Sequence, residues 1–255
     1  MVEQDRAEKP DYGNWVATRL VYVPAAIGLI FAGLAVPFPL LAIPAAIFLL
    51  IALYFAYARY LFSPQGRNVQ NQIRGLVAPH LDWNGEGQLL DIGCGSGALA
   101  IELAKKYPRA QVTGIDHWGG SWEYSREVCA RNAEIEGVSG RVAFEQGSAA
   151  ALPFADETFD AVVSNLTFHE VGGVKDKKEL IREALRVLKK GGPFTFQDLF
   201  LWKQVYGEPQ DLVRAVKSWG VSEVELINTS ESSFIPAALK LPFMAGTIGI
   251  LAGRK

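Results

Sequence analysis

Apolar side chains are distributed in two different ways along this chain. From Leu20 to Ala58 there is no charged residue, and the run is rich in Leu, Ile, Ala, Phe and Val. From about residue 88 onward, short apolar runs alternate with amphipathic stretches and end in polar residues or glycine. The first pattern is typical of helices that cross a membrane, and the second is typical of alternating strands and helices.

The charge-free run is long enough for two membrane-spanning helices, because one crossing takes about 20 apolar residues. Pro37-Phe38-Pro39 lies near its middle, where two prolines would end a helix and turn the chain. We therefore expect spans at about 19–36 and 40–61, with membrane contact through residues 19–61. A cleaved signal peptide fits less well because the run is too long. A soluble, dimer-forming hairpin fits less well because such helices usually carry charge on one face.

Positive charges flank the open side of this predicted hairpin and are absent from its turn. The flanking residues are Arg6, Lys9, Arg19, Arg59, Arg67 and Arg74. Segments rich in Lys and Arg stay on the cytoplasmic side of a membrane. The prediction is therefore a cell-membrane protein whose two termini and following domain are cytoplasmic.

The rest of the chain alternates between strand and helix patterns. After the run at Leu89, strands are expected at Gln111–Asp116, Val142–Glu145, Phe159–Asn165 and Phe194–Asp198, with Val224–Asn228 and Thr247–Arg254 as a closing pair. Helices are expected at Asn68–Pro79, Ala98–Tyr107, Ser121–Glu136, Lys177–Lys189 and Pro209–Trp219. This order predicts an α/β fold, with a doubly wound, Rossmann-like, mostly parallel sheet and helices on both faces, preceded by the two-helix transmembrane hairpin.

These patterns divide the chain into three parts, and its bulk properties narrow the chemistry. Residues 1–62 form the tail and membrane anchor, 63–87 a connector helix and loop, and 88–255 the α/β domain. The formal net charge of −2 argues against a nucleic-acid-binding surface. Cys94 and Cys129 are the only cysteines and are not spaced as ligands, so we expect a reducing compartment and no metal site.

The first strand of the α/β domain ends in a glycine-rich turn. The stretch Leu89-Leu90-Asp91-Ile92-Gly93-Cys94-Gly95-Ser96-Gly97 is an apolar run that ends in an acid and then in alternating glycines. Glycine permits dihedral angles closed to other residues and lets a ligand approach the backbone, with the next helix pointing its N-terminus at that ligand. An ordinary strand-to-helix turn has a similar pattern, so this signal alone is weak.

A second acid supports the ligand-binding interpretation. Asp116 ends the second strand, 19 positions after Gly97, where its carboxylate would lie beside the crevice and bind both hydroxyls of a ribose. Two classes of enzyme share this arrangement, nicotinamide-dependent oxidoreductases and S-adenosylmethionine-dependent methyltransferases. A dinucleotide site favours GxGxxG because its helix start lies against a pyrophosphate. The spacing here is GxGxG, and adenosylmethionine has no pyrophosphate, so the pattern favours the methyltransferases.

Four motifs further along the chain separate these classes. They are Gly147-Ser148-Ala149-Ala150-Ala151-Leu152-Pro153-Phe154, Asp156 to Asp160, Ala161-Val162-Val163-Ser164-Asn165, and Leu185-Arg186-Val187-Leu188-Lys189-Lys190-Gly191-Gly192. Together they resemble the class I S-adenosylmethionine-dependent methyltransferases, particularly the small-molecule and lipid-quinone branch. The resemblance runs from about Gln88 to Asp198 and is specific for fold and cofactor, although not for substrate.

The resemblance implies a binding site for S-adenosylmethionine at defined residues. These are Asp91, Gly93, Cys94, Gly95, Gly97, Asp116, His117, Trp118, Ser148, Ala149 and Asn165. Asp91 and the glycine turn would hold the methionine part of the cofactor, and Asp116 would bind the ribose.

The remaining residues would surround the adenine and the sulfonium. His117 and Trp118 would flank the adenine, and Asn165 would lie under the sulfonium. The family usually has an acid at the position of Ser148, where it binds the adenine amino group. Here the serine hydroxyl, or the backbone of Ala149, would take its place.

His169 is the candidate catalytic residue. It follows the fourth strand in Asn165-Leu166-Thr167-Phe168-His169-Glu170, where it would face the transferred methyl group. A neutral imidazole can accept the proton of a hydroxyl or thiol. A loop histidine that packs or caps a helix fits equally well, because Glu170 is the only orienting partner visible in the sequence. The Asn-Pro-Pro-aromatic motif of enzymes that methylate base amino groups is absent, which argues further against a nucleic-acid substrate.

These inferences combine into one prediction with two alternatives. The chain is expected to be a membrane-anchored S-adenosylmethionine-dependent methyltransferase whose acceptor is a small lipophilic molecule, such as a lipid, a quinone-like compound or a hydrophobic thiol. Residues 234–243 would either line its entrance from the bilayer or pack between the last two strands. The alternatives are a non-catalytic, membrane-held S-adenosylmethionine-binding sensor or scaffold and, third, an NAD-dependent oxidoreductase.

Overall fold

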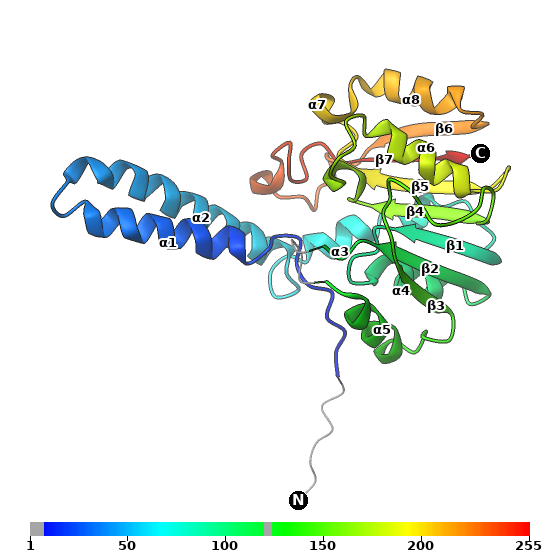
Figure 1. Cartoon of the computed structure of the whole chain (residues 1–255), viewed down its shortest axis with the longest axis horizontal. Coiled ribbons are helices and arrows are strands. Elements are labelled where there is room, and N and C mark those ends of the chain that lie inside the picture. The colour runs from blue at the N-terminus through cyan, green and yellow to red at the C-terminus, as the bar shows by residue number, and fades with distance from the viewer. Residues whose placement is uncertain (1–7, 120–123) are drawn as a thin grey trace, which may run out of the picture. The chain divides into compact units, whose positions relative to one another are not determined.

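The computed structural model describes residues 8–119 and 124–255, which form two compact units (Figure 1). Residues 14–73 form the hairpin unit, and residues 8–13, 74–119 and 124–255 form the sheet unit. The connector expected at 63–87 is thus shared between the two units, and the segment 8–13 belongs with the sheet.

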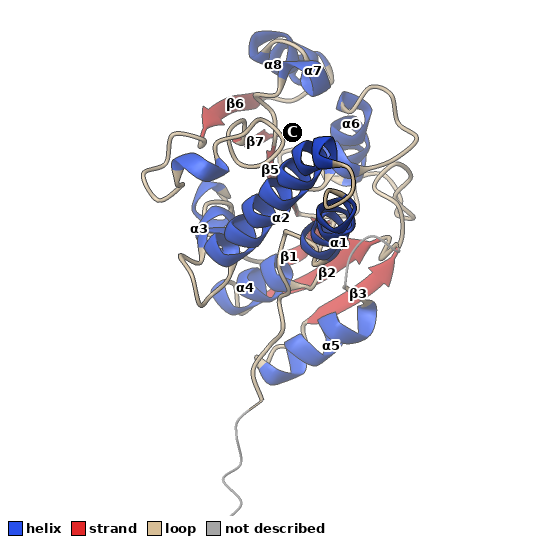
Figure 2. Ribbon diagram, turned by 90° about the vertical axis from the view of Figure 1, so that its left-hand side faces the viewer, coloured by secondary structure: helices blue, strands red, loops and turns tan. Residues whose placement is uncertain are grey.

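Two long helices make up most of the hairpin unit. The helices α1 (Arg19–Leu34) and α2 (Ala42–Phe62) lie side by side and are joined through a short 3-10 turn, η1 (Pro39–Leu41) (Figures 1 and 2). Their positions agree with the helices expected at 19–36 and 40–61. The sequence therefore located both helices correctly.

The two helices are packed closely against each other. Gly28 of α1 is buried, and a Cβ atom added there would lie 2.8 Å from Cγ of Leu49 in α2. The rings of Phe31 and Phe48 stack with centroids 6.0 Å apart. Small and aromatic side chains therefore form the contact between the helices.

Only one helix among the described residues is long and apolar enough to cross a membrane, and it spans Pro39–Phe62. The helix α1 is equally apolar but has 16 residues. About 20 residues are needed for one crossing, so the length of α1 does not by itself establish a second transmembrane span.

The sheet unit is built on seven strands in the order β3-β2-β1-β4-β5-β7-β6. The strands are β1 (Gly87–Ile92), β2 (Ala110–Asp116), β3 (Val142–Gln146), β4 (Ala161–Asn165), β5 (Pro193–Asp198), β6 (Glu223–Asn228) and β7 (Gly249–Arg254). The first five strands pair in parallel, and β7 is antiparallel to both β5 and β6. The mostly parallel sheet with a closing pair is confirmed.

Helices cover both faces of this sheet. They are α4 (Ala98–Lys106), α5 (Arg126–Ile135), α6 (Lys178–Val187), α7 (Lys203–Tyr206) and α8 (Pro209–Ser218). Neighbouring residues of β1 point to opposite faces: Leu89 packs in the cluster that contains α4 and α5, and Leu90 packs in the cluster that contains α6 and α8. Two apolar cores result, one on each face, as a doubly wound fold requires.

The largest differences between the prediction and the structure concern three helices. The helix α5 begins after Ser125, whose hydroxyl accepts a hydrogen bond from the N–H of Val128 at 3.3 Å, and residues 121–123 of the predicted helix lie outside the described residues. The helix expected at 68–79 is split into α3 (Val69–Arg74) and a 3-10 turn. The short helix α7 was not predicted.

The order of strands determines where a ligand can bind. The strand β1 lies between β2 and β4, so the chain leaves β1 toward one side of the sheet and later continues on the other. At such a switch point the connections diverge and leave a crevice beyond the carboxyl ends of the strands. The glycine turn after β1 lies at this crevice.

Candidate cofactor and catalytic site

The glycine turn can be formed only by glycine at two of its positions. Gly93 and Gly97 have φ of 72° and 80°, in the left-handed region. A Cβ atom at Gly93 would lie 2.0 Å from Oγ1 of Thr167, and one at Gly97 would lie 2.8 Å from Cζ of Phe144. The turn is therefore enclosed by the loop after β4 on one side and by β3 on the other.

Asp116 fixes the far side of this turn. Its Oδ2 accepts a hydrogen bond from the N–H of Gly95 at 2.8 Å, and its Oδ1 accepts one from the N–H of Trp118 at 2.8 Å. The indole N–H of Trp118 in turn donates to the carbonyl of Gly95 at 2.8 Å. The tips of β1 and β2 are therefore held together by the residues predicted to bind the cofactor.

Asp91 differs from Asp116 because one of its oxygens has no partner. Its side chain is 1 % exposed, and Oδ2 has no hydrogen-bond partner among the described residues. Burial raises the pKa of Asp91 to about 7, and the negative charge of Asp116 adds to the shift, whereas the N–H of Ala100 and the charge of Arg74 oppose it. A buried carboxylate with a vacant acceptor position is suited to a cationic N–H donor.

Asn165 provides a second such acceptor on the neighbouring strand. It ends β4, which pairs with β1 so that Ser164 faces Ile92. Its Oδ1 is buried and has no hydrogen-bond partner among the described residues. The ammonium and sulfonium of S-adenosylmethionine are both cationic, so this pair of acceptors beside an open glycine turn fits that cofactor.

The other predicted cofactor residues lie around the same edge. Cys94 is buried, burial raises the pKa of its thiol, and only its backbone belongs to the turn. His117 is exposed and Trp118 half-buried. The hydroxyl of Ser148 accepts from the N–H of Ala150 at 3.1 Å, so it is engaged in its own turn. Ala149 is half-buried, and the adenine contacts of these residues stay predictions.

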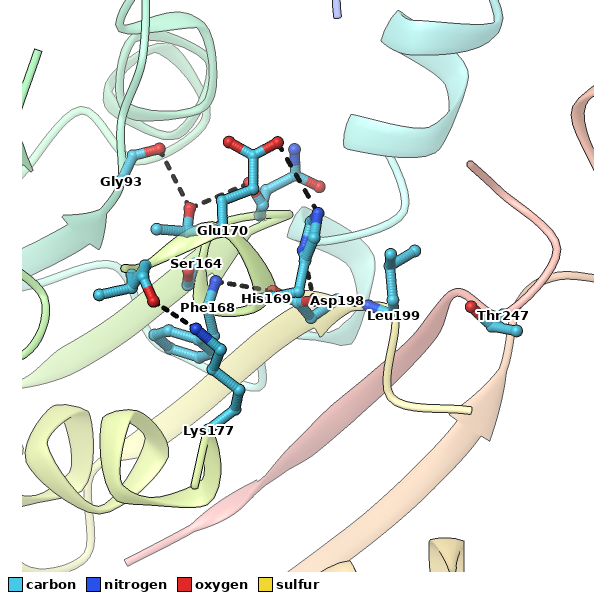
Figure 3. Close-up of polar contacts among 12 residues, drawn as sticks. Gly93, Ser164, Phe168, His169, Glu170, Lys177, Asp198, Leu199 and Thr247 are labelled. Atoms are coloured by element: carbon cyan, nitrogen blue, oxygen red, sulfur yellow. Dashed lines mark hydrogen bonds and ion pairs between the residues drawn. The ribbon is translucent and has the colours of Figure 1, made fainter. Parts of the chain in front are cut away.

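His169 has an orienting partner that the sequence did not reveal. Its Nδ1 lies 2.7 Å from Oδ1 of Asp198, the last residue of β5 (Figure 3). The other carboxylate oxygen accepts the N–H of Phe168 at 2.8 Å, and Oδ1 also accepts the N–H of Leu199 at 2.6 Å. Glu170, the partner considered from the sequence, lies 3.8 Å from Nε2, beyond hydrogen-bond distance.

The electrostatics of this pair favour a base at Nε2. Burial would lower the pKa of His169, but the carboxylate of Asp198 outweighs burial and raises it. Burial would raise the pKa of Asp198, yet His169 and the N–H of Leu199 hold it below its ordinary value. Since Asp198 stays ionised, it accepts a hydrogen bond from Nδ1–H and leaves the unprotonated Nε2 as the proton acceptor.

A sequence signal for Asp198 was available. Asp91 and Asp116 were selected because each is an acid at the carboxyl end of a parallel strand, and Asp198 has the same position in β5. Because Asn165 pairs with Gln197, Asp198 lies one residue beyond the tip of β4, where the loop to His169 begins.

Comparison with known proteins identifies relatives of this domain. Residues 90–196 match a family described as "Methyltransferase domain". The chain is 38% identical over 106 residues to norajmaline N-methyltransferase of Rauvolfia serpentina, covering 41% of this chain and 33% of that protein. It is 32% identical over 130 residues to the ubiquinone/menaquinone biosynthesis C-methyltransferase UbiE of Geobacter sulfurreducens, covering 49% and 48%. The chain thus spans a third to a half of the length of these relatives.

Solved structures show the same fold at low sequence identity. Geranyl diphosphate C-methyltransferase from Streptomyces coelicolor, in complex with S-adenosyl-L-homocysteine and geranyl diphosphate, has a TM-score of 0.57 at 15% identity, over 73% of this chain and 79% of that one. The [4+2]-cyclase SpnF has a TM-score of 0.55 at 22% identity, over 74% and 82%. At these identities the likeness establishes the fold alone.

Proposed function

We propose that the chain is a membrane-anchored, S-adenosylmethionine-dependent methyltransferase acting on a small lipophilic acceptor; the match of residues 90–196 to a methyltransferase domain supports this proposal. Three of its relatives have names that refer to small molecules, namely norajmaline, ubiquinone or menaquinone, and 27-O-demethylrifamycin SV, while a fourth is a release factor glutamine methyltransferase. A quinone-like compound, a lipid or a hydrophobic thiol would belong to this range.

The observation that carries the choice of a lipophilic acceptor is the exposed apolar surface of the hairpin unit. Eight large apolar side chains there are 62–85 % exposed: Leu29, Ile30, Val36, Phe38, Leu40, Ile43, Leu50 and Leu53. Soluble proteins rarely leave such a continuous apolar surface in water, whereas a bilayer would cover it. An enzyme with a freely soluble acceptor would gain nothing from such an anchor.

In this proposal the hairpin enters the membrane from the cytoplasm. The helix α2 is long enough to cross, and α1 packs along it. Arg19 and Arg59 lie at the open end of the hairpin, and the turn at Pro39 has no charge. The positive-inside rule then leaves both termini and the sheet unit in the cytoplasm, at the cell membrane.

The site supports proton removal from an O–H or S–H acceptor. The bound cofactor would supply a methyl group on a sulfonium, which is already a good leaving group, so alignment provides much of the catalysis. Nε2 of His169 takes the acceptor's proton while Asp198 holds Nδ1–H. The deprotonated acceptor would displace the methyl group from the cofactor's sulfonium, and the electron pair of the broken carbon–sulfur bond would stay on sulfur.

The loop from 229 to 248 is the proposed side of entry for the acceptor. It follows β6 at the same sheet edge as the site, because Gly249 at its far end pairs with Asp198. Its residues Leu241 and Phe243 are 38 % and 50 % exposed. Two roles were considered for residues 234–243. Leu239 is buried, which agrees with core packing. Leu241 and Phe243 are exposed and could contact an apolar ligand.

The experiment that tests this function incubates the detergent-solubilised full chain with methyl-labelled cofactor and membrane extract. We expect S-adenosylhomocysteine to form only with extract, and label to appear in an extractable lipophilic product. Label confined to water-soluble compounds would contradict bilayer access. Cofactor binding without any turnover would instead indicate a sensor or scaffold, and preferential binding of NAD would indicate an oxidoreductase.

The anchor is tested separately by Leu50→Arg in the middle of α2. A charge at the centre of a membrane helix costs about 2.5–3.5 kcal/mol of insertion free energy, so more of the protein should be released from membranes by alkaline carbonate. The matched control is Arg109→Gln, on a sheet-unit side chain that is 75 % exposed. Equal retention of both variants would contradict membrane insertion.

A further inference from the structure

The amide of Gln197 is buried at the carboxyl end of β5. Gln197 is the residue before Asp198 and is 0 % exposed. Its Oε1 and its Nε2 both lack a hydrogen-bond partner among the described residues. Most buried side-chain amides are hydrogen-bonded, because burying an unpaired donor or acceptor is costly. This amide is therefore suited to bind a group that the chain does not itself supply.

The register of the sheet shows on which face this amide lies. Gln197 pairs with Asn165 of β4 on one side and with Ile250 of β7 on the other. Paired residues share a face of a sheet, as do alternate residues of one strand. Asn165 therefore shares its face with Val163, which pairs with Asp91 of β1. Gln197 thus belongs to a row that crosses β1, β4, β5 and β7 on one face.

This row changes from polar to apolar as it crosses the sheet. On one side of Gln197 lies Asn165, a predicted cofactor residue whose Oδ1 also lacks a partner among the described residues. On the other side lies Ile250, which is 0 % exposed and follows the loop 229–248, the proposed side of entry. An acceptor with a polar end and an apolar body matches this order of side chains.

The loop that carries His169 is attached to the same residue of β5. The N–H of Leu166 donates to the backbone carbonyl of Gln197 at 2.7 Å. Leu166 has φ of 54°, in the left-handed region that bulky side chains rarely adopt. Strained backbone of this kind is concentrated at binding and catalytic sites. The next residue, Asp198, orients the ring of His169, so Gln197 lies in the strand end that positions the proton acceptor.

The chemistry of an amide limits what it can bind. Its nitrogen donates hydrogen bonds and its oxygen accepts them, so it can pair with a carbonyl or with a hydroxyl group. In the proposed mechanism the proton of the methylated oxygen goes to His169. The amide therefore needs a second polar atom close to that oxygen. A simple hydrophobic thiol has no such atom, whereas a ring with oxygens on two neighbouring carbons has one.

We propose that Gln197 binds the acceptor and selects lipophilic molecules with oxygens on two neighbouring carbon atoms. One oxygen gives its proton to Nε2 of His169 and receives the methyl group, and the other is hydrogen-bonded to the amide of Gln197. The inference rests on the proposed function, because it names the polar end of the proposed acceptor. Gln197 is then a specificity-determining residue next to the catalytic histidine and aspartate.

Two ring compounds of similar size isolate the effect of the second oxygen. The dihydroxy probe is 2,3-dihydroxynaphthalene, and the monohydroxy probe is 2-naphthol. Their affinities are measured by calorimetry for the detergent-solubilised full chain saturated with S-adenosylhomocysteine, and kcat and KM are measured with S-adenosylmethionine. We expect the dihydroxy probe to bind roughly 10- to 100-fold more tightly, because the monohydroxy probe leaves the buried amide unpaired.

Substitution of Gln197 should remove this preference. Gln197→Leu replaces the amide with an apolar side chain of similar size. We expect its affinity for the dihydroxy probe to fall roughly 10- to 100-fold, and those for the monohydroxy probe and S-adenosylhomocysteine to change less than about 2-fold. In turnover the change should appear in KM more than in kcat. The matched control, Gln111→Leu at an exposed position of β2, should leave every affinity unchanged.

Other outcomes overturn the proposal. Equal affinities of the unmodified chain for the two probes, or no binding of either, would contradict it even if Gln197→Leu does not fold. An equal loss for both probes in Gln197→Leu would show that the amide only supports the fold. Methyl transfer to a lipophilic product of membrane extract without this preference would contradict this inference alone. The preference without any methyl transfer would leave the subsite intact and contradict the proposed function.

Discussion

Two aspartates at the same sheet edge are fully buried, yet their charges are balanced in opposite ways. Asp198 accepts hydrogen bonds from the backbone N–H groups of Phe168 and Leu199 and from His169. Burial would raise the pKa of Asp198, but His169 and the N–H of Leu199 hold it low. Asp91 has an oxygen without a partner among the described residues, and burial raises its pKa to about 7. The same residue type is therefore charged in one position and half-protonated near neutral pH in the other.

This difference separates a part of the site that the chain completes itself from a part that a ligand completes. Asp198 has its hydrogen-bond donors within the protein, because His169 Nδ1–H and two backbone N–H groups supply them, and the neutral imidazole can take a proton at Nε2. Asp91 is left with a desolvated carboxylate whose cation arrives with the cofactor. The catalytic side and the cofactor side should therefore respond differently to substitution and to pH.

The largest expected effect is on turnover at the catalytic side. His169→Ala should lower kcat roughly 10²- to 10⁴-fold for an O–H or S–H acceptor, since it removes the general base, and should leave S-adenosylhomocysteine affinity unchanged. His80→Ala is the matched control, as His80 contacts the backbone carbonyl of Leu76. Unchanged turnover in His169→Ala would exclude an essential base.

On the cofactor side the expected effect is on binding. Asp91→Asn should weaken S-adenosylhomocysteine roughly 10- to 100-fold, because the ammonium loses its charged partner. Calorimetry measures the affinity, and His169→Ala serves as the comparison on the catalytic side. If both substitutions weakened binding to the same extent, the distinction between a cofactor side at Asp91 and a catalytic side at His169 would be wrong.

The same substitution, Asp91→Asn, should raise thermal stability although it weakens ligand binding. The folded pKa of Asp91 lies above its ordinary 3.8, so the folded state favours the neutral acid and loses stability as pH rises from about 4 to about 7. Asp91→Asn should therefore melt several degrees above the unmodified chain at pH 8 and close to it at pH 4. A lower melting temperature at pH 8 would contradict the unpaired burial of this carboxylate.

The smallest expected effect is the pH dependence of the Asp198–His169 pair. The raised pKa of His169 contributes stability that is present below 6.5 and is lost as pH rises through the folded value. The lowered pKa of Asp198 contributes stability that is present above 3.8 and is lost at lower pH. Asp198→Asn should thus be most destabilised between about pH 4 and 6.5, as measured by thermal melts, and a constant deficit up to pH 9 would argue against the ion pair.

Local patterns in the sequence predicted much of the cofactor side. Asp91, the glycines and Asp116 lie in two strand–turn segments, where an apolar run, an acid and a spacing are enough to identify the site. Both long helices of the hairpin were also predicted, because their lack of charge is a local property. Insertion of the hairpin into a bilayer stays a proposal, because it depends on surroundings that the chain's own atoms do not include.

The contacts missed by the sequence all join distant segments. Asp198 meets His169 only because β4 pairs with β5, which local patterns do not specify. The amide of Asn132 on α5 joins Asp11 to Ser96, and the neighbouring Tyr12 contacts both Ser96 and Arg74. An unpaired acid and a buried arginine have no distinguishing signal before the fold is known.

The most direct measurement of the contrast between the two aspartates is the number of protons released when S-adenosylhomocysteine binds. It is obtained at pH 7 by calorimetry in buffers of different ionisation enthalpy. With a pKa of about 7 in the free protein and an ammonium beside it in the complex, Asp91 should release about half a proton per ligand, and Asp91→Asn should release that much less. Equal proton release by the two proteins would contradict the assignment of Asp91 as the acid that the cofactor completes.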